Sequence, residues 1–158
     1  MSRFILAIVV LGMSDPTGAA DGLDLSHAVI ITRGDRASEV ERTAATVLVE
    51  EVEKRTGLRW KIAADFAGNA PAIVVAASLD GAAWSQAVPA RVRDAWPALR
   101  AEGYRVVSET DGKRPIVWTV GTDARGALYG VGHLLRKLEM QAGSVGLQPR
   151  SLPKLPAK

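Results

Sequence analysis

The sequence of 158 residues contains no cysteine. Disulfide bridges, thiol nucleophiles and thiolate metal sites are therefore excluded for this chain. Histidine is scarce as well: only His27 and His133 occur, and they form no HxH or HxxxH pair. Because zinc needs three or four converging ligands, a metal site here would have to be built largely from carboxylates. We expect neither a metal nor another cofactor.

The body of the chain also lacks an excess of charge of one sign. The formal net charge is +3, but Arg3 and Asp15 cancel near the N-terminus, and Arg150, Lys154 and Lys158 have no acidic neighbours near the C-terminus. Setting these residues aside leaves 16 basic and 16 acidic residues between positions 21 and 139. A nucleic-acid surface requires clustered basic residues, so nucleic acid is not an expected partner.

No apolar run is long enough to span a bilayer, which takes about 20 residues. The run at residues 4–13 follows Arg3 and precedes the small residues Gly18-Ala19-Ala20. This pattern is typical of a signal peptide. We expect residues 1–20 to be removed after Ala19 or Ala20, and the mature protein to be secreted or periplasmic. The alternative is that the apolar run forms an N-terminal strand.

The strongest helix signal begins at Ser38. Ser38-Glu-Val-Glu41 is a capping box, in which the serine and Glu41 side chains each bind a backbone amide at the helix start. Gly57 stands where a left-handed residue ends a helix. The positions expected to face the core are Val40, Ala44, Val47, Leu48 and Val52. The acidic side chains expected on the solvated surface are Glu39, Glu41, Glu50, Glu51 and Glu53.

Short apolar runs predict several strands. The run Ala72–Ala76 is apolar at every position, which is typical of a strand buried on both faces near the centre of a sheet. Asp111-Gly112 predicts a hairpin turn between the last two strands. The expected strands span residues 28–32, 60–62, 72–76, 104–109 and 116–120, with a short helix from near Pro89 that turns Val92, Trp96 and Leu99 inward.

A second long helix is predicted over residues 122–139. Thr122 or Asp123 can cap its first turn. Glycine inside a helix costs about 1 kcal/mol relative to alanine, yet Gly126, Gly130 and Gly132 all fall within it. Gly126 and Gly130 lie on one face, so we expect another backbone to pack closely there. The residues at apolar helical spacing are Ala127, Leu128, Val131, Leu134, Leu135 and Leu138.

These glycines do not form a phosphate or dinucleotide loop. Their spacing departs from G-x-G-x-x-G, and they lie inside an amphipathic helix and not before one. A phosphate group binds to exposed backbone amides at the start of a helix, and glycines inside a helix do not provide them.

Together the elements predict an α+β fold with a mixed sheet of about four to five strands and two long helices packed on one face. The domain is expected to span residues 21–140. Residues 141–158 are rich in Gly, Pro and Ser, and we interpret them as a proline-rich linker or tail.

Three segments resemble the non-catalytic accessory domain that precedes the catalytic barrel in α-glucuronidases and β-N-acetylhexosaminidases. They are Glu53-Lys-Arg-Thr-Gly57, Glu102-Gly-Tyr-Arg105 and Asp123-x-x-Gly126-x-x-Tyr129-Gly130-x-x-x-Leu134-Leu135, and the likeness covers roughly residues 28–139. The resemblance implies a small α/β unit without catalytic residues, whose partner is a (β/α)8 barrel in the same or a longer chain.

No candidate active site emerges from the residues themselves. Glycoside hydrolysis normally needs two carboxyl groups about 5–9.5 Å apart, one of them held protonated. The acidic residues here fall on helix surfaces or in turns, and no Gly-x-Ser-x-Gly turn presents a nucleophile. Among the tryptophans, Trp60 and Trp118 are expected in the core, whereas Trp84 is a candidate for an exposed sugar-stacking surface. We assign no catalytic, cofactor-binding or metal-binding residue.

Two main hypotheses of function follow. The first is a non-catalytic accessory domain of a secreted glycoside hydrolase that packs on and stabilises a barrel absent from this chain. The alternative is a stand-alone carbohydrate- or protein-binding module of the cell envelope, with a polysaccharide as its candidate ligand. A small hydrolase in its own right is a third and weaker alternative. An exposed aromatic strip would favour the binding module.

Overall fold

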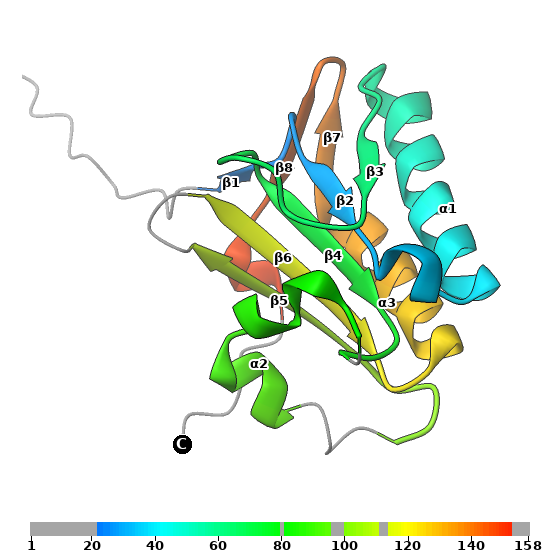
Figure 1. The fold of residues 1–158 in the computed structure, drawn as a ribbon. Coiled ribbons are helices and arrows are strands. Elements are labelled where there is room, and N and C mark those ends of the chain that lie inside the picture. Colours follow the sequence, from blue (N-terminus) through cyan, green and yellow to red (C-terminus); the bar gives the residue numbers. More distant parts are fainter. Residues whose placement is uncertain (1–21, 80, 96–99, 111–113, 153–158) are drawn as a thin grey trace, which may run out of the picture.

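A five-stranded mixed sheet forms the centre of the computed structural model, which describes residues 22–79, 81–95, 100–110 and 114–152 (Figure 1). Its strands are β2 (Val29–Ile31), β3 (Lys61–Ala63), β4 (Ala72–Ala76), β5 (Tyr104–Thr110) and β6 (Pro115–Gly121), in the order β3-β2-β4-β6-β5. The first four of these in sheet order are parallel, and β5 runs antiparallel to β6 at the edge. The helices are α1 (Glu39–Thr56), α2 (Ala90–Ala95) and α3 (Ala124–Lys137), with 3₁₀ turns η1 (Gly34–Arg36), η2 (Ala83–Ala87) and η3 (Pro149–Ser151).

The ends of α1 are those that the sequence predicts. The Glu41 amide donates to the Ser38 hydroxyl at 3.2 Å, and the Ser38 amide donates to the Glu41 carboxylate at 2.8 Å, which completes the capping box. Gly57 ends the helix with φ of 75° and donates its amide to the Glu53 carbonyl. Local sequence alone therefore determines where this helix begins and ends.

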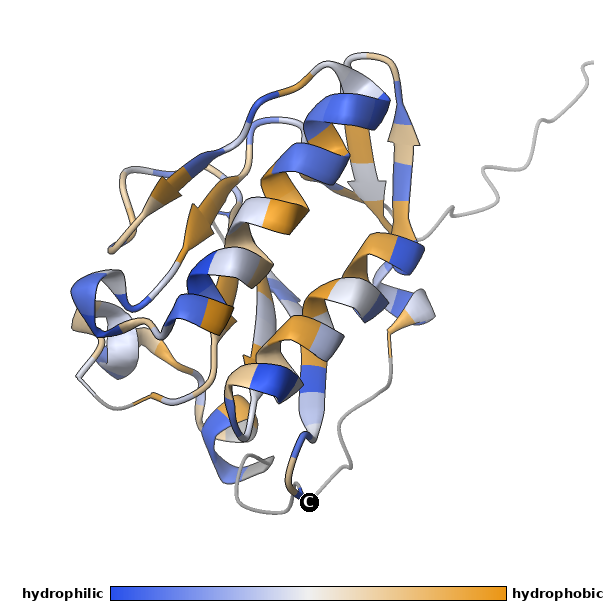
Figure 2. Ribbon diagram, turned by 90° about the vertical axis from the view of Figure 1, so that its right-hand side faces the viewer, coloured by the Kyte–Doolittle hydropathy of each residue, from blue (hydrophilic) through white to orange (hydrophobic). Residues whose placement is uncertain are grey.

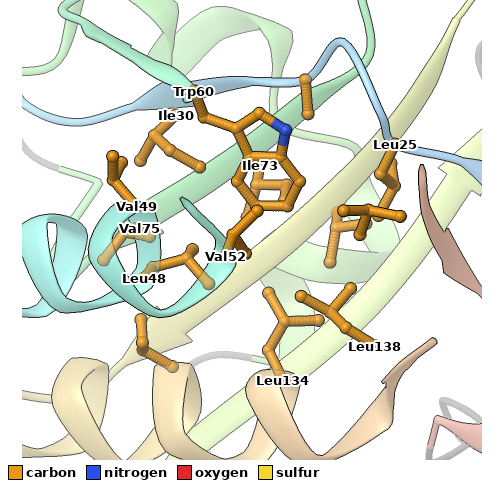
Figure 3. Close-up of a cluster of buried hydrophobic side chains, with 14 of the residues drawn as sticks. Leu25, Ile30, Leu48, Val49, Val52, Trp60, Ile73, Val75, Leu134 and Leu138 are labelled. Carbon is orange, nitrogen blue, oxygen red and sulfur yellow. The ribbon is translucent and has the colours of Figure 1, made fainter. Parts of the chain in front are cut away.

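Both long helices pack on one face of the sheet, as predicted, and run side by side across it (Figure 2). Ile30, Ile73 and Val75 of the sheet meet Leu48 and Val52 of α1 and Leu134 of α3, with Trp60 closing one end of the cluster (Figure 3). The predicted fold class, a mixed sheet of five strands with two long helices on one face, is confirmed.

The opposite face of the sheet is covered by the segment that contains η2 and α2. Trp84, Val88 and Val92 are buried there against Val74 and Trp118. Every residue of β4 is buried, which confirms its expected position at the centre of the sheet. Val92 faces inward as predicted, whereas Trp96, Leu99 and the expected turn at Asp111-Gly112 fall outside the described residues, as does the expected leader at 1–20.

The chain after α3 differs from the prediction of a linker or tail. Residues 138–147 form a hairpin of β7 (Leu138–Gln141) and β8 (Ser144–Leu147), which joins β1 (Leu23–Asp24) in a small antiparallel sheet of order β1-β8-β7. The two-residue turn uses Gly143 at φ of 73°, and its amide donates to the Thr56 carbonyl at the end of α1. The predicted boundary at residue 140 therefore falls inside β7.

The physical reason is that the large apolar side chains of the hairpin alternate along its two strands, as the sequence of a half-buried strand requires. Leu138, Val145, Leu147 and Leu152 are buried in the core beneath the helices. The predicted helix over 122–139 accordingly ends at Lys137, because Leu138 already belongs to β7.

The buried stripe of α1 is also offset from the predicted one. Val40 is 36% exposed and Val47 is half-buried, whereas Glu41, Ala45 and Val49 are buried. A stripe that includes Glu41 keeps helical spacing through to Thr56. Apolar character alone therefore gave the wrong phase at the start of the helix.

The glycines of α3 separate into two that contact the sheet side and one that does not. A Cβ at Gly126 would collide with the carbonyl oxygen of Gly103, and one at Gly130 would lie 2.9 Å from Cγ2 of buried Thr119. At Gly132 the nearest neighbouring atom would be Nη1 of Arg136, at 3.7 Å. Close packing thus explains the first two glycines. At Gly126 the neighbour is a backbone, as predicted, whereas at Gly130 it is the side chains of Thr119 and Tyr104 and not a backbone.

We expect Gly126→Ala and Gly130→Ala to lower the free energy of unfolding by roughly 1–3 kcal/mol, because the added methyl group overpacks the contact. Gly130→Val should lower it further. Gly132→Ala is the matched control and should raise the free energy of unfolding by up to about 1 kcal/mol, because alanine favours helix and has room. Denaturant midpoints measure all four variants. Stabilisation by Gly130→Ala would contradict the packing interpretation.

Candidate functional site

The carboxyl ends of parallel strands are where open α/β sheets commonly bind ligands. In this chain, Thr32 and Arg33 follow β2, Ala77 follows β4, and the N-terminus of α1 lies at the same edge. The side chain that occupies the position is Glu41, which is 0% exposed. The prediction that Glu41 lies on a solvated surface is therefore wrong.

Both carboxylate oxygens of Glu41 accept two hydrogen bonds each. Oε1 accepts from Arg33 Nε at 2.9 Å and from the Ala77 amide at 2.8 Å. Oε2 accepts from Arg33 Nη2 at 2.6 Å and from the Ser38 amide at 2.8 Å. The fork-like pairing with arginine is the strong form of a charged hydrogen bond. One side chain thereby joins α1 to the ends of β2 and β4.

The environment keeps Glu41 ionised. Burial acts to raise the pKa of the Glu41 carboxyl, but the hydrogen bonds from Arg33, the Ser38 amide and the Ala77 amide, together with the charge of Arg33, outweigh it and lower the pKa. A general acid needs a raised pKa and a nucleophile needs a free lone pair. Glu41 has neither, so its role in this geometry is structural.

Among the described residues, two further carboxyl groups have a displaced pKa, and both pKa values are lowered. Hydrogen bonds from the Ser26 side chain and amide lower the pKa of Asp24. Hydrogen bonds from the amides of Gly126 and Glu102 lower the pKa of Asp123. None of these groups is set up as the protonated partner that a glycosidase pair requires.

Asp123 belongs to a junction between the start of β5 and the start of α3. Its Oδ1 accepts from the Gly126 amide at 2.8 Å, which caps the helix as predicted, and its Oδ2 accepts from the Glu102 amide at 2.7 Å. Glu102 has φ of 58° and forms a salt bridge with Arg125 at 2.9 Å. The Thr122 amide donates to the Gly103 carbonyl at 2.9 Å. These contacts hold the two segments together.

Two of the three segments that carry the family resemblance meet at this junction. Gly103 packs against Gly126, and Tyr104 packs against Gly130. The Tyr104 hydroxyl lies 3.1 Å from Nδ1 of His133. The residues of the resemblance are thus contacts between β5 and α3, and the sequence pattern describes packing.

The tryptophans provide no exposed sugar platform in the described structure. Trp60 and Trp118 are buried, as predicted. Trp84, the candidate for exposure, is only 2% exposed, so that prediction is wrong. Its Nε1 donates to the Thr32 carbonyl at 2.9 Å, and its ring centroid lies 6.0 Å from that of Trp118. The indole covers the second face of the sheet, where the chain needs a large apolar side chain.

Within the described ranges, no three His, Asp or Glu side chains gather where they could hold a metal ion. His27 is exposed, and His133 is half-buried against Tyr104. None of the helices in the described part of the chain combines the length and hydrophobicity needed to cross a bilayer.

No family model and no curated protein matches this sequence. Among solved structures, the chain is similar to BtGH115A, a family GH115 4-O-methyl-α-glucuronidase with specificity for decorated arabinogalactans, with a TM-score of 0.50 and 21% identity over 73% of this chain. It is also similar to CpGH84D, with a TM-score of 0.51 and 11% identity over 82% of this chain. The matched regions cover only 14% and 21% of those two glycoside hydrolase chains. At these identities the similarity concerns the fold.

We expect Glu41→Gln to lower the free energy of unfolding by about 3–5 kcal/mol, because it removes the negative partner of a buried charge. Since the pKa of Glu41 is lowered in the folded state, its stabilisation is complete above the ordinary carboxyl pKa of about 4.3 and is lost as the pH falls through the folded-state value. The variant should therefore lose less stability on acidification than the wild type.

Glu50→Gln is the control for this prediction, because Glu50 is exposed on the same helix. Its effect should stay within about 0.5 kcal/mol. Urea unfolding at pH 7 and at pH 3–4 measures both variants. Equal effects of the two substitutions would show that the buried carboxylate does not hold the strands together.

Proposed function

We propose that this chain is a non-catalytic accessory domain of a secreted glycoside hydrolase of the α-glucuronidase or β-N-acetylhexosaminidase kind. Its role is to pack on and stabilise a catalytic (β/α)8 barrel that is absent from this chain. The observation that carries the proposal is the pair of coverages: most of this chain matches 14% and 21% of two much larger glycoside hydrolase chains.

The chemistry of the described carboxyl groups supports the same proposal. Glu41 is saturated by four donors, and Asp123 is held by two backbone amides. The place where an α/β sheet could bind a ligand is therefore filled by the chain's own groups. A domain of this kind contributes fold and surface, while the reaction takes place elsewhere in the enzyme.

The alternative of a stand-alone binding module depended mainly on an exposed aromatic surface. Trp84 is buried, and among the described large hydrophobic residues that are exposed, Tyr129 is the only aromatic one, at 48% exposure. A single ring on a convex helix is a poor match for the flat stacking surface that a polysaccharide requires. The accessory domain is therefore the better supported of the two functions.

We expect the isolated chain to hydrolyse neither aryl glucuronides nor aryl N-acetylhexosaminides, because no two carboxyl groups in the described part of the chain are arranged as acid and nucleophile. A complete glycoside hydrolase of each kind serves as the positive control. Turnover by this chain that disappears when one Asp or Glu is replaced would contradict the proposal.

The gene and the natural protein provide the direct test. We expect the reading frame, or an adjacent one, to encode a barrel of about 200 residues or more. Mass spectrometry of the protein from its own host should find barrel peptides in the same polypeptide or in a stable complex with it. It should also find residues 1–18 missing if the leader directs export. A mature protein that carries intact Met1 would contradict the removal of a leader. A protein without a barrel in the same polypeptide or in a complex would contradict the accessory role.

A further inference from the structure

In the contact between Tyr104 of β5 and His133 of α3, only one of the two ring nitrogens of His133 has a hydrogen-bond partner. The Tyr104 hydroxyl lies 3.1 Å from Nδ1 of His133, and the two rings meet edge to face with centroids 5.6 Å apart. The second ring nitrogen, Nε2, is buried and has no hydrogen-bond partner. The imidazole therefore has one hydrogen bond and one unsatisfied nitrogen.

Packing, and not chance, brings the two side chains together. A Cβ at Gly130 would lie 3.4 Å from Cβ of Tyr104, so the glycine leaves room for the tyrosine beside the helix. His133 lies one turn beyond Gly130 on the same side of α3. The tyrosine side chain extends along this turn, and its hydroxyl group lies next to the imidazole of His133.

The contact between β5 and α3 at Tyr104 and His133, the seam between these elements, accommodates a neutral imidazole and does not accommodate an imidazolium. A neutral ring carries one N–H, and its bond with the tyrosine hydroxyl can run in either direction. An imidazolium carries two N–H donors, and the hydroxyl can accept only one of them. The Nε2–H of the cation would be left buried without an acceptor, which is the costly state for a charged group.

The surrounding charges act in the same direction. The elements packed against α3 include β4 and β6, neither of which contains a titratable residue. α1 contributes the apolar side chains of Ala44, Leu48 and Val52 to the shared core. On β5, Arg105 and Glu109 are one and five residues from Tyr104. Because side chains alternate along a strand, theirs point to the other face of the sheet. The charges that act on the ring are the two cations Lys137 and Arg136.

Burial, followed by repulsion from Lys137 and Arg136, lowers the pKa of His133 below its ordinary value. The folded protein thus holds the ring neutral at pH 7.

We propose that the Tyr104–His133 contact is an acid-sensitive lock between α3 and β5, closed while the imidazole is neutral and released when it takes up a proton. β5 is an edge strand held by β6 on one side and by the packing of α3 across it. Release of the lock loosens the second attachment. It also frees the part of α3 that carries exposed Tyr129, so the surface of this helix becomes dependent on pH.

Nuclear magnetic resonance of the intact chain tests the lock directly, because the sequence has only two histidines. His27→Gln assigns the imidazole signals and is the matched control, since His27 is exposed. We expect the His133 signal to titrate below the ordinary histidine pKa of about 6.5. A His133 titration at 6.5 or above would overturn the proposal without any change to the residues of the lock.

Hydrogen exchange locates the opening. Because the pKa of His133 is lowered in the closed state, the open state binds the proton more tightly. The stability of the closed state therefore falls as the pH drops from about 6.5 through the folded-state pKa. After correction for intrinsic exchange, the opening constant of α3 and β5 amides should rise by up to tenfold per pH unit in this window. Amides in the middle of α1 should change less.

His133→Gln distinguishes a lock from an ordinary packing contact. A purely structural role predicts that the variant is weaker by the same factor at every pH. The lock predicts that opening in the variant is nearly independent of pH between about 5 and 7, while His27→Gln retains the wild-type response. A wild-type pH dependence in His133→Gln, or exchange that does not change on acidification, would overturn the proposal.

Discussion

The carboxylate of Glu41 is the contact on which the arrangement of α1 and the parallel strands depends. Among the described residues it is the only charged side chain that is buried. Its four hydrogen bonds come from the loop after β2, the start of α1 and the end of β4. The loop after β2 and the start of α1 are thereby held against the end of β4, which lies 36 residues further along the chain from Glu41. A buried charge is tolerated only when such partners are present.

Among the described residues, the same contact fills the place where an α/β sheet commonly binds a ligand. A helix N-terminus next to strand ends attracts an anion. Here the anion is the carboxylate of Glu41, which belongs to the chain itself. On the opposite face of the sheet, Trp84 covers the same strand ends and donates its Nε1–H to the Thr32 carbonyl. The chain therefore uses this edge for stability. This use is consistent with the accessory role proposed above.

The sequence could predict those features that depend on neighbouring residues. The capping box at Ser38, the left-handed Gly57 and the cap at Asp123 each need only a few adjacent positions, and all three are present. The uniformly apolar β4 also revealed its central place. The close packing at Gly126 and Gly130 was inferred correctly because glycine in a helix interior has a cost that needs a reason.

The wrong predictions depend on partners that are not adjacent in the sequence. Glu41 looks solvated until Arg33 and Ala77 are brought beside it, although its helical spacing to Ala44, Leu48 and Val52 was a usable signal. Trp84 is buried because Trp118 of β6 lies opposite it. The sequence does not reveal the hairpin of β7 and β8, because its glycines and the prolines that follow from Pro149 conceal the alternation of Leu138, Met140, Val145 and Leu147. In each case tertiary packing outweighed local composition.

Buried Glu41 and half-buried His133 also divide the response of the fold to acid into two ranges. His133 controls the seam between α3 and β5, and its stabilising contribution declines below the ordinary histidine pKa of about 6.5. Glu41 controls the joint of α1, β2 and β4, and its contribution declines only below the ordinary carboxyl pKa of about 4.3. Acidification should therefore loosen the antiparallel edge of the sheet before it reaches the parallel part. The order follows from where the chain places the two groups: the histidine lies beside cations next to edge strand β5, and the carboxylate lies beside an arginine at the ends of β2 and β4.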